Sequence, residues 1–172
     1  MHTEWTLRPI RADEADEGKR LVYGVAHALM EPQMPLQDFI AQWVTWDILG
    51  DMTDVQTTYW DNIGVFLVAV DGGRMVGTGA IHQTAERPGV CDVRRIALLP
   101  EYRGRGLGYA LMLELRRRAL DMGYHTMLLW TNRFKLTRAV AFYRQLGFVE
   151  VAHADAYEDE IWMEWEISPA NR

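Results

Sequence analysis

Residues 91–122 read CDVRRIALLPEYRGRGLGYALMLELRRRALDM, and this stretch decides the fold. An apolar strand, a turn at Pro100, a glycine-rich loop and an amphipathic helix follow one another in it. Gly104, Gly106 and Gly108 alternate with other residues and lead directly into the helix. Glycines let a ligand approach the backbone closely, and the first N–H groups of a helix have no partner within it. The loop therefore predicts a binding site for an anion such as a phosphate group.

Two arginines lie among these glycines and add full positive charge to the predicted anion site. We expect the backbone N–H groups from Gly104 to Gly108, including that of Leu107, to bind phosphate together with the side chains of Arg103 and Arg105. The spacing G-x-G-x-G differs from the dinucleotide fingerprint G-x-G-x-x-G, and no Lys-Ser or Lys-Thr pair follows, as a P-loop requires. A structural turn with solvated arginines is the alternative explanation.

Two segments of the chain resemble one known family. The pattern R-x-x-G-x-G at residues 103–108 resembles the pyrophosphate-binding loop of the GNAT superfamily of acyl-CoA-dependent N-acetyltransferases. Residues 139–148, AVAFYRQLGF, resemble the family's A-x-x-F-Y-x-x-L-G-F segment and follow in the same order. The resemblance extends over nearly the full length. It implies acetyl-CoA as the acyl donor and an amine as the acceptor, with Ile96, Ala97 and Leu98 pairing with pantetheine at a bulge in the strand.

The resemblance also implies roles in the chemistry. Tyr143 stands where the family often places a tyrosine near the sulfur of CoA, which makes it the predicted general acid. Asp92 matches an acidic position that some members use as general base, although an aspartate in a strand can equally pair with an arginine. His82 is a lesser candidate for the base, because imidazole titrates near neutrality. The N–H group of Leu98 is expected to polarise the thioester carbonyl.

The chain departs from the family pattern before the last helix. Many members carry an asparagine seven residues before the tyrosine, where this chain has Leu136. Asn132 lies earlier, in a longer loop with Lys135. We expect Asn132 to contact the cofactor and Lys135 to approach the phosphate of the adenosine. No metal ligands are assigned.

Composition narrows the class of protein. A length of 172 residues with 49% hydrophobic residues fits one N-acetyltransferase domain over residues 1–172. A net charge of −6 argues against general binding to nucleic acid or to an anionic membrane, even though residues 116–118 are three arginines. The single cysteine, Cys91, excludes an internal disulfide and is expected to be buried. Without an apolar leader or a long apolar run, the sequence predicts a cytoplasmic protein.

Hydrophobic periodicity predicts an α/β fold with a mixed central sheet of about seven strands and about four flanking helices. Expected helices run from a cap at Asp13 to Met30 and over residues 36–49, 107–122 and 136–146. Expected strands cover residues 4–10, 63–70, 74–83, 90–99, 126–131, 148–152 and 161–167.

The acceptor stays open at the level of sequence. The helix at residues 36–49 is rich in aromatic residues, which either form core or line a pocket for an apolar acceptor. A small amine, an amino acid, an antibiotic and a protein amine are all compatible. Two other classes are a non-catalytic acyl-CoA-binding or sensory module and a protein-interaction domain with a relic loop. The aromatic strand at residues 162–165 also suits a homodimer contact.

Overall fold

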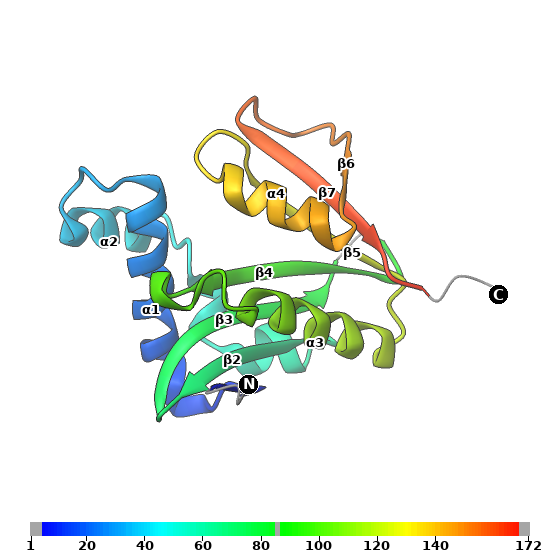
Figure 1. Ribbon diagram of the computed structural model, residues 1–172, viewed down its shortest axis with the longest axis horizontal. Helices are drawn as coiled ribbons and strands as arrows, with labels where there is room; N and C mark the ends of the chain where they lie inside the picture. Colours follow the sequence, from blue (N-terminus) through cyan, green and yellow to red (C-terminus); the bar gives the residue numbers. More distant parts are fainter. Residues whose placement is uncertain (1–4, 85–86, 169–172) are drawn as a thin grey trace.

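The structure is a computed structural model that describes residues 5–84 and 87–168. In this part of the chain, seven strands form one mixed sheet in the order β1-β2-β3-β4-β5-β7-β6 (Figure 1). The strands are β1 Trp5–Pro9, β2 Val65–Asp71, β3 Arg74–Gln83, β4 Val90–Leu98, β5 Thr126–Asn132, β6 Val149–Val151 and β7 Glu160–Glu166. The α-helices are α1 Ala15–Met30, α2 Leu36–Thr45, α3 Leu107–Asp121 and α4 Thr137–Leu146. The predicted α/β fold is confirmed.

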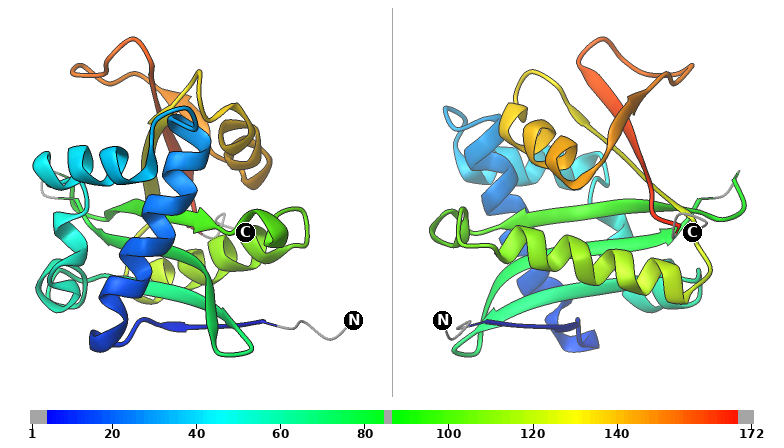
Figure 2. Two further views of the ribbon diagram at one scale, coloured as in Figure 1. Left: turned by 90° about the vertical axis from the view of Figure 1, so that its left-hand side faces the viewer. Right: turned by 45° about the vertical axis from the view of Figure 1, so that its right-hand side comes forward.

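Helices cover both faces of the sheet. Figure 2 shows α1 and α3 on opposite sides of β2, β3 and β4. Under α3 and α4, fully buried side chains such as Leu111, Leu115 and Met127 form one core. Under α1, Val22 and Phe66 belong to a second core. The sheet therefore separates two apolar layers, as the expected amphipathic helices require.

The sheet opens between β4 and β5. These strands pair in parallel only up to Asp92 and Leu128, and they diverge beyond this point (Figure 2). On its other edge, β4 carries a bulge, because Arg95 and Ile96 together oppose the single residue Gly79 of β3. Arg95 has a left-handed backbone conformation with φ 58°. A bulge bends the strand locally, which helps β4 to turn away from β5.

Asp13 does not cap the first long helix, so this prediction is wrong. Residues Ala12–Glu14 form a short 3-10 turn, η1, and α1 starts after it. The carboxylate of Glu14 accepts the backbone N–H of Arg11 at 2.8 Å and a guanidinium N–H of Arg8 at 2.5 Å. These hydrogen bonds, chiefly the one from Arg8, hold the pKa of Glu14 at about 2. Glu14 therefore ties the turn to β1.

Two other elements start or end at least two residues away from the predicted position. The helix expected over residues 36–49 ends at Thr45, since Asp47 adopts a left-handed conformation with φ 52° that a helix does not continue. The strand expected from Ile63 begins at Val65, because Ile63 also has positive φ, 48°. Gly64 lies so close to β3 that a Cβ there would be 2.2 Å from the carbonyl oxygen of Ile81. Both changes shorten elements without changing their order.

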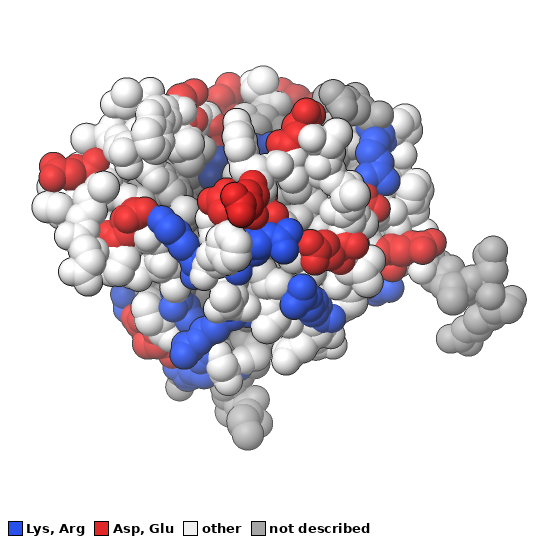
Figure 3. Space-filling model, turned by 90° about the horizontal axis from the view of Figure 1, so that it is seen from above, with Lys and Arg blue, Asp and Glu red and all other residues white. Residues whose placement is uncertain are grey.

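The single cysteine is buried, as predicted. Cys91 is fully buried in β4, and burial raises the pKa of its thiol to about 12. In the face that Figure 3 shows, basic side chains are interspersed with acidic ones. No described helix has both the length and the apolar character needed to cross a bilayer.

Candidate active site

The glycine loop lies at the start of α3. Gly106 is the residue before the helix and has φ 86°, and Gly104 has φ 70°; both are left-handed conformations that favour glycine. A Cβ at either position would have no heavy atom within 4 Å. Open space therefore lies beside both glycines, next to the first turn of α3, whose N–H groups have no partner within the helix and carry the positive end of its dipole. An anion fits this position.

A cavity of about 730 Å³ opens beside this loop, and we call it the loop cavity. It lies between the end of β4, the glycine loop and the first turn of α4, whose N-terminal end also faces it. Two helix N-termini therefore bring positive ends of dipoles to one cavity. Its lining includes the predicted cofactor residues Ile96, Ala97, Leu98, Arg103, Gly104, Gly106 and Gly108, together with Lys135, Thr137, Arg138 and Phe142.

Arg105 and Leu107, which alternate with the loop glycines, differ in what they can offer a phosphate group. The guanidinium of Arg105 lies over the ring of Tyr102, 5.4 Å from its centroid, and Arg105 is not among the residues that line the loop cavity. The side chain of Leu107 is fully buried in the core, so only its backbone N–H is oriented for a ligand. Arg103 lines the cavity and donates a hydrogen bond to the carbonyl oxygen of Leu98 at 3.2 Å.

A second cavity, of about 570 Å³, adjoins the first, and we call it the aromatic cavity. It lies between α1, α2 and the diverging strands β4 and β5, with the start of β7 at its edge. Trp43 and Trp46, from the aromatic segment predicted as core or pocket, line it. The two cavities meet at residues that line both: Val25, Leu29, Ile96, Ala97, Leu136, Ala139 and Tyr143.

Tyr143 lies at this junction, on the inward face of α4. The side chains of Val140 and Leu146 anchor the same face in the core, and the Tyr143 ring packs against Phe148 with centroids 5.7 Å apart. Burial raises the pKa of the Tyr143 phenol above its ordinary value. The hydroxyl is therefore protonated at neutral pH and is a hydrogen-bond donor where the cavities meet.

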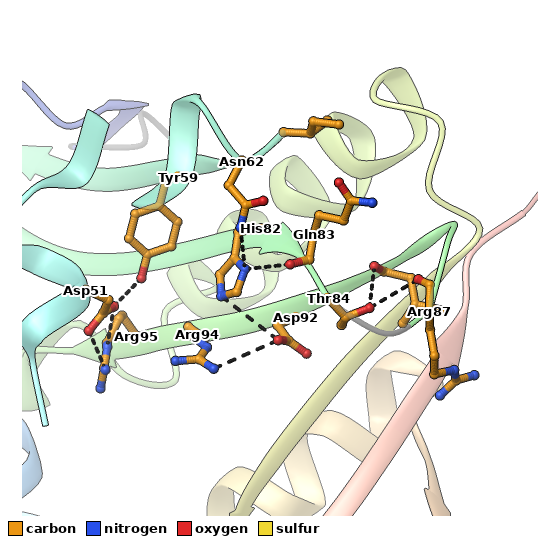
Figure 4. A network of polar contacts seen from close by, with 12 residues as sticks. Asp51, Tyr59, Asn62, His82, Gln83, Thr84, Arg87, Asp92, Arg94 and Arg95 are labelled. Carbon is orange, nitrogen blue, oxygen red and sulfur yellow. Dashed lines mark hydrogen bonds and ion pairs between the residues drawn. The ribbon is translucent and has the colours of Figure 1, made fainter. Parts of the chain in front are cut away.

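A buried ion pair anchors the bulge of β4. The Nε and Nη2 atoms of Arg95 donate to the two carboxylate oxygens of Asp51 at 2.9 and 2.5 Å (Figure 4). Nη2 also donates to the carbonyl oxygen of Ile48 at 2.6 Å. The hydroxyl of Tyr59 donates to the same carboxylate. On the other side, Thr78 donates to the carbonyl oxygen of Arg95 at 2.7 Å. These contacts fix the backbone of the bulge next to both cavities.

Replacing Arg95 by methionine is expected to destabilise the protein. The side chains of Arg95 and Asp51 are only 17% and 11% exposed, so the variant leaves a buried carboxylate without its cation. We expect the free energy of unfolding at neutral pH, measured with urea, to fall by about 2 to 4 kcal/mol. Arg117→Met, at an exposed ion pair on α3, is the control and should change stability little. Equal stability of the Arg95 variant and wild type would contradict the anchoring role.

The ion pair between Arg95 and Asp51 also predicts that the stability of the protein depends on pH. Burial alone would raise the pKa of Asp51, but hydrogen bonds from Arg95 and Tyr59 outweigh it, and the pKa lies below its ordinary value. Because the pKa of Asp51 is lowered in the folded protein, the ion pair stabilises the fold at pH values above the ordinary pKa of aspartate. This stabilisation is lost as the pH falls through the folded-state pKa. The difference in stability between wild type and Arg95→Met should therefore narrow in acid.

The two candidate bases lie together at the narrow end of the opening between β4 and β5. Nε2 of His82 is 4.0 Å from a carboxylate oxygen of Asp92, and Arg94 is 3.9 Å from the same oxygen (Figure 4). Nδ1 of His82 is 2.8 Å from the carbonyl oxygen of Gln83, which favours a proton on Nδ1. Burial raises the pKa of Asp92, opposed by Arg94 and His82. Neither candidate is among the residues that line the two cavities.

Asn132 lies in the aromatic cavity and not in the loop cavity, where a cofactor contact was expected. Its Oδ1 accepts the backbone N–H groups of Phe134 and Lys135 at 3.0 and 2.8 Å, and its Nδ2 donates to Asp159 at 2.7 Å. The side chain thus holds the turn between β5 and α4. Lys135 does line the loop cavity, and it forms an ion pair with Glu31.

The chain is similar to known proteins in both sequence and fold. Residues 36–148 match the Acetyltransferase (GNAT) family. The IAA acetyltransferase of Azospirillum brasilense is 34% identical over 128 residues, which are 69% of this chain and 82% of that protein. The mycothiol acetyltransferase of Pseudarthrobacter chlorophenolicus is 38% identical over 93 residues, which are 52% of this chain and 28% of that protein. The chain spans about half or less of several curated relatives that it matches, such as 47% of N-acetyltransferase family 8 member 2 of Rattus norvegicus.

Solved structures share the fold at low sequence identity. An acetyltransferase of the GNAT family from Staphylococcus aureus superposes with a TM-score of 0.78 at 15% identity, over 95% of this chain and 99% of that one. The PaiA N-acetyltransferase of Thermoplasma acidophilum, solved in complex with coenzyme A, superposes with a TM-score of 0.76 at 17% identity, over 94% of this chain and 98% of that one.

Proposed function

This chain belongs to the GNAT family of acetyltransferases, and from that premise we propose that it transfers the acetyl group of acetyl-CoA directly to a primary amine. One observation carries the proposal. The glycine loop at the start of α3 opens on a cavity that meets a second cavity at Tyr143, which lines both. A donor held by its phosphates at the loop and an amine in the aromatic cavity would therefore meet at this residue.

The loop cavity fits the donor. Backbone N–H groups of residues 104–108 and the side chain of Arg103 are assigned to its pyrophosphate, because they combine positive charge with open space. Lys135 and Arg138 supply further positive charge on the opposite wall. The diverging end of β4, at Ala97 and Leu98, is assigned to the pantetheine arm. We assign no contact with the donor to Arg105 and Asn132, because both side chains make contacts within the protein.

Acetyl-CoA supplies a thioester whose carbonyl carbon accepts the amine nitrogen, with the sulfur as leaving group. The backbone N–H of Leu98 is assigned to the carbonyl oxygen, where negative charge develops during the attack. Tyr143 is assigned to the departing sulfur. Since burial raises the pKa of this phenol, its hydroxyl acts mainly by donating a hydrogen bond to the sulfur as charge builds up there.

Asp92 is assigned to receive the proton of the amine through water, with His82 beside it. Because burial raises the pKa of Asp92, its carboxylate is a stronger base than that of an ordinary aspartate. Once protonated, the carboxyl group can no longer accept the proton of the amine. We expect kcat to fall as the pH drops through a pKa above the ordinary aspartate value. Asp92→Asn should lower kcat by about tenfold to hundredfold and remove this acid limb. An unchanged pH profile in Asp92→Asn would transfer the role to another group.

A transfer assay tests the function. The purified chain is incubated with acetyl-CoA and a panel of primary amines, free CoA is measured with a thiol reagent, and the N-acetylated amine is identified by mass spectrometry. The proposal predicts release of CoA that depends on the amine and matches the amount of product. Binding of acetyl-CoA without transfer to any amine would favour a non-catalytic acyl-CoA-binding module.

A cytoplasmic location and a homodimer remain predictions from sequence. The strand suggested for the dimer contact, β7, lies between β5 and β6 in the sheet.

A further inference from the structure

A histidine and an aspartate, His82 and Asp92, lie side by side just behind the aromatic cavity. They are opposite each other in the register of β3 and β4, so their side chains share one face of the sheet (Figure 4). Arg94, two residues after Asp92, lies on the same face and lines the cavity. The side chains of Arg94, Asp92 and His82 are 41%, 24% and 13% exposed. Exposure therefore decreases along this row, from the cavity to His82.

The contacts of His82 determine where its ring carries a proton. Nδ1 is 2.8 Å from the carbonyl oxygen of Gln83, which can only accept a hydrogen bond. Nδ1 is also 3.4 Å from the side-chain amide nitrogen of Asn62, but this contact is the longer and weaker of the two. The proton of the neutral ring therefore lies on Nδ1, and Nε2 carries a lone pair. The ring of Tyr59 packs edge-on against the imidazole, with centroids 5.7 Å apart, and supports this orientation.

The lone pair of Nε2 faces a second acceptor. Nε2 is 4.0 Å from a carboxylate oxygen of Asp92, which is too long for a direct hydrogen bond (Figure 4). In the resting state, neither of these two atoms has a proton to donate to the other. A proton on Nε2 turns the contact into an attraction between an imidazolium and a carboxylate. The two side chains are therefore suited to hold one proton between them.

The charges around the pair favour His82 as the place where this proton stays. The guanidinium of Arg94 is 3.9 Å from the same carboxylate oxygen and favours the ionised form of Asp92. Burial raises the pKa of Asp92, but the positive charges of Arg94 and of protonated His82 oppose this rise. Tyr59, the titratable group that packs on the ring, stays neutral, because burial raises the pKa of its phenol. Its hydroxyl donates to Asp51 and not to the pair.

We propose that His82 takes the proton of the amine from Asp92 and so restores Asp92 as the base. This inference rests on the proposed acetyltransferase function and adds a residue to its proton path. When the nitrogen of the neutral amine attacks the thioester, a C–N bond forms and the C–S bond breaks. The proton that the nitrogen loses passes through water to Asp92 and then to Nε2, while CoA leaves as a thiolate. His82 then releases the proton to the solvent. Because it acts through Asp92, His82 is a positioning residue.

The pH profile of kcat tests this role. We would compare wild type with His82→Gln, using saturating acetyl-CoA and the best amine found in the transfer assay. In the variant, kcat should fall about tenfold, and its acid limb should move to lower pH, because a carboxyl group titrates below an imidazole. The control is His125→Gln, at a histidine that lines neither cavity, and it should keep both quantities. An acid limb at the same pH in His82→Gln and wild type overturns the inference.

A double variant distinguishes this role from a purely structural one. Because His82 acts only through Asp92, Asp92→Asn combined with His82→Gln should have the same kcat as Asp92→Asn alone. If the two losses multiply, His82 contributes independently of Asp92, and the inference is wrong.

The ring nitrogens of His82 provide a readout that does not depend on turnover or on a variant. In wild-type protein with isotope-labelled histidine, NMR distinguishes a ring nitrogen that carries hydrogen from one with a lone pair. The neutral ring of His82 should carry its hydrogen on Nδ1, and a hydrogen on Nε2 instead overturns the inference. Failure of the wild-type protein to acetylate any amine contradicts the proposed function itself, and the inference falls with it.

Discussion

Replacing Gly106 by valine should weaken the binding of CoA and acetyl-CoA at least about hundredfold, since several hydrogen bonds to a charged group are lost together. Gly106 has φ 86°, a conformation that a β-branched residue avoids, so the first turn of α3 has to change. The added side chain would also fill the open space beside Gly106 at the start of the helix. The dissociation constant of CoA, measured by calorimetry, checks this expectation.

Gly123→Val is the matched control. Gly123 follows α3 at its other end, has φ 89°, and a Cβ there would also have no heavy atom within 4 Å. Both variants therefore carry comparable backbone strain, and both should unfold at lower temperature than wild type. Only Gly106→Val should lose CoA. If CoA affinity survives in Gly106→Val, the phosphates bind elsewhere.

Removing the hydroxyl of Tyr143 should lower kcat by about a hundredfold or more and leave the dissociation constant of CoA unchanged. The ring stays packed against Phe148 in Tyr143→Phe, so the cavity keeps its shape. Only the donor to the departing sulfur is lost, and this donor matters when negative charge develops on the sulfur. Steady-state kinetics with saturating amine, together with CoA titrations, separate the two quantities.

Tyr124→Phe controls for the loss of a buried hydroxyl. The hydroxyl of Tyr124 donates to the carbonyl oxygen of Ile63 at 2.5 Å, away from both cavities. This control should lose some stability and keep its kcat. Equal losses of kcat and CoA affinity in Tyr143→Phe would contradict the role of Tyr143 as donor to the sulfur and indicate a structural role instead.

Much of the fold follows from local patterns in the sequence. The glycines before α3 determine where this helix starts, because their left-handed conformations are open to few other residues. Gly147, with φ 115°, ends α4 in the same way. Alternation and apolar runs predict the strands, but not their order in the sheet, in which the last strand, β7, lies between β5 and β6. The family resemblance adds the expectation that β4 bulges. The register of β3 with β4 shifts between Thr78 and Ala80, which agrees with this expectation.

The parts that sequence reasoning missed depend on contacts between distant segments. Asp51 and Arg95 are 44 residues apart, and nothing in their spacing indicates that they form a buried pair. The amide of Asn132 is engaged by Asp159, 27 residues further along the chain, which sequence alone does not reveal. The pKa of Tyr143 is another case, since the ordinary value of a phenol is about 10 and only burial in the folded core raises it.

Thermal unfolding with added ligand shows whether the loop cavity binds acetyl-CoA. A ligand that binds only the folded protein raises the midpoint of unfolding as its concentration increases. We would measure the midpoint with acetyl-CoA, CoA and NAD in parallel. We expect the midpoint to rise with acetyl-CoA and with CoA but not with NAD, and we expect neither rise in Gly106→Val. No rise with either CoA compound in the wild-type protein would contradict this expectation.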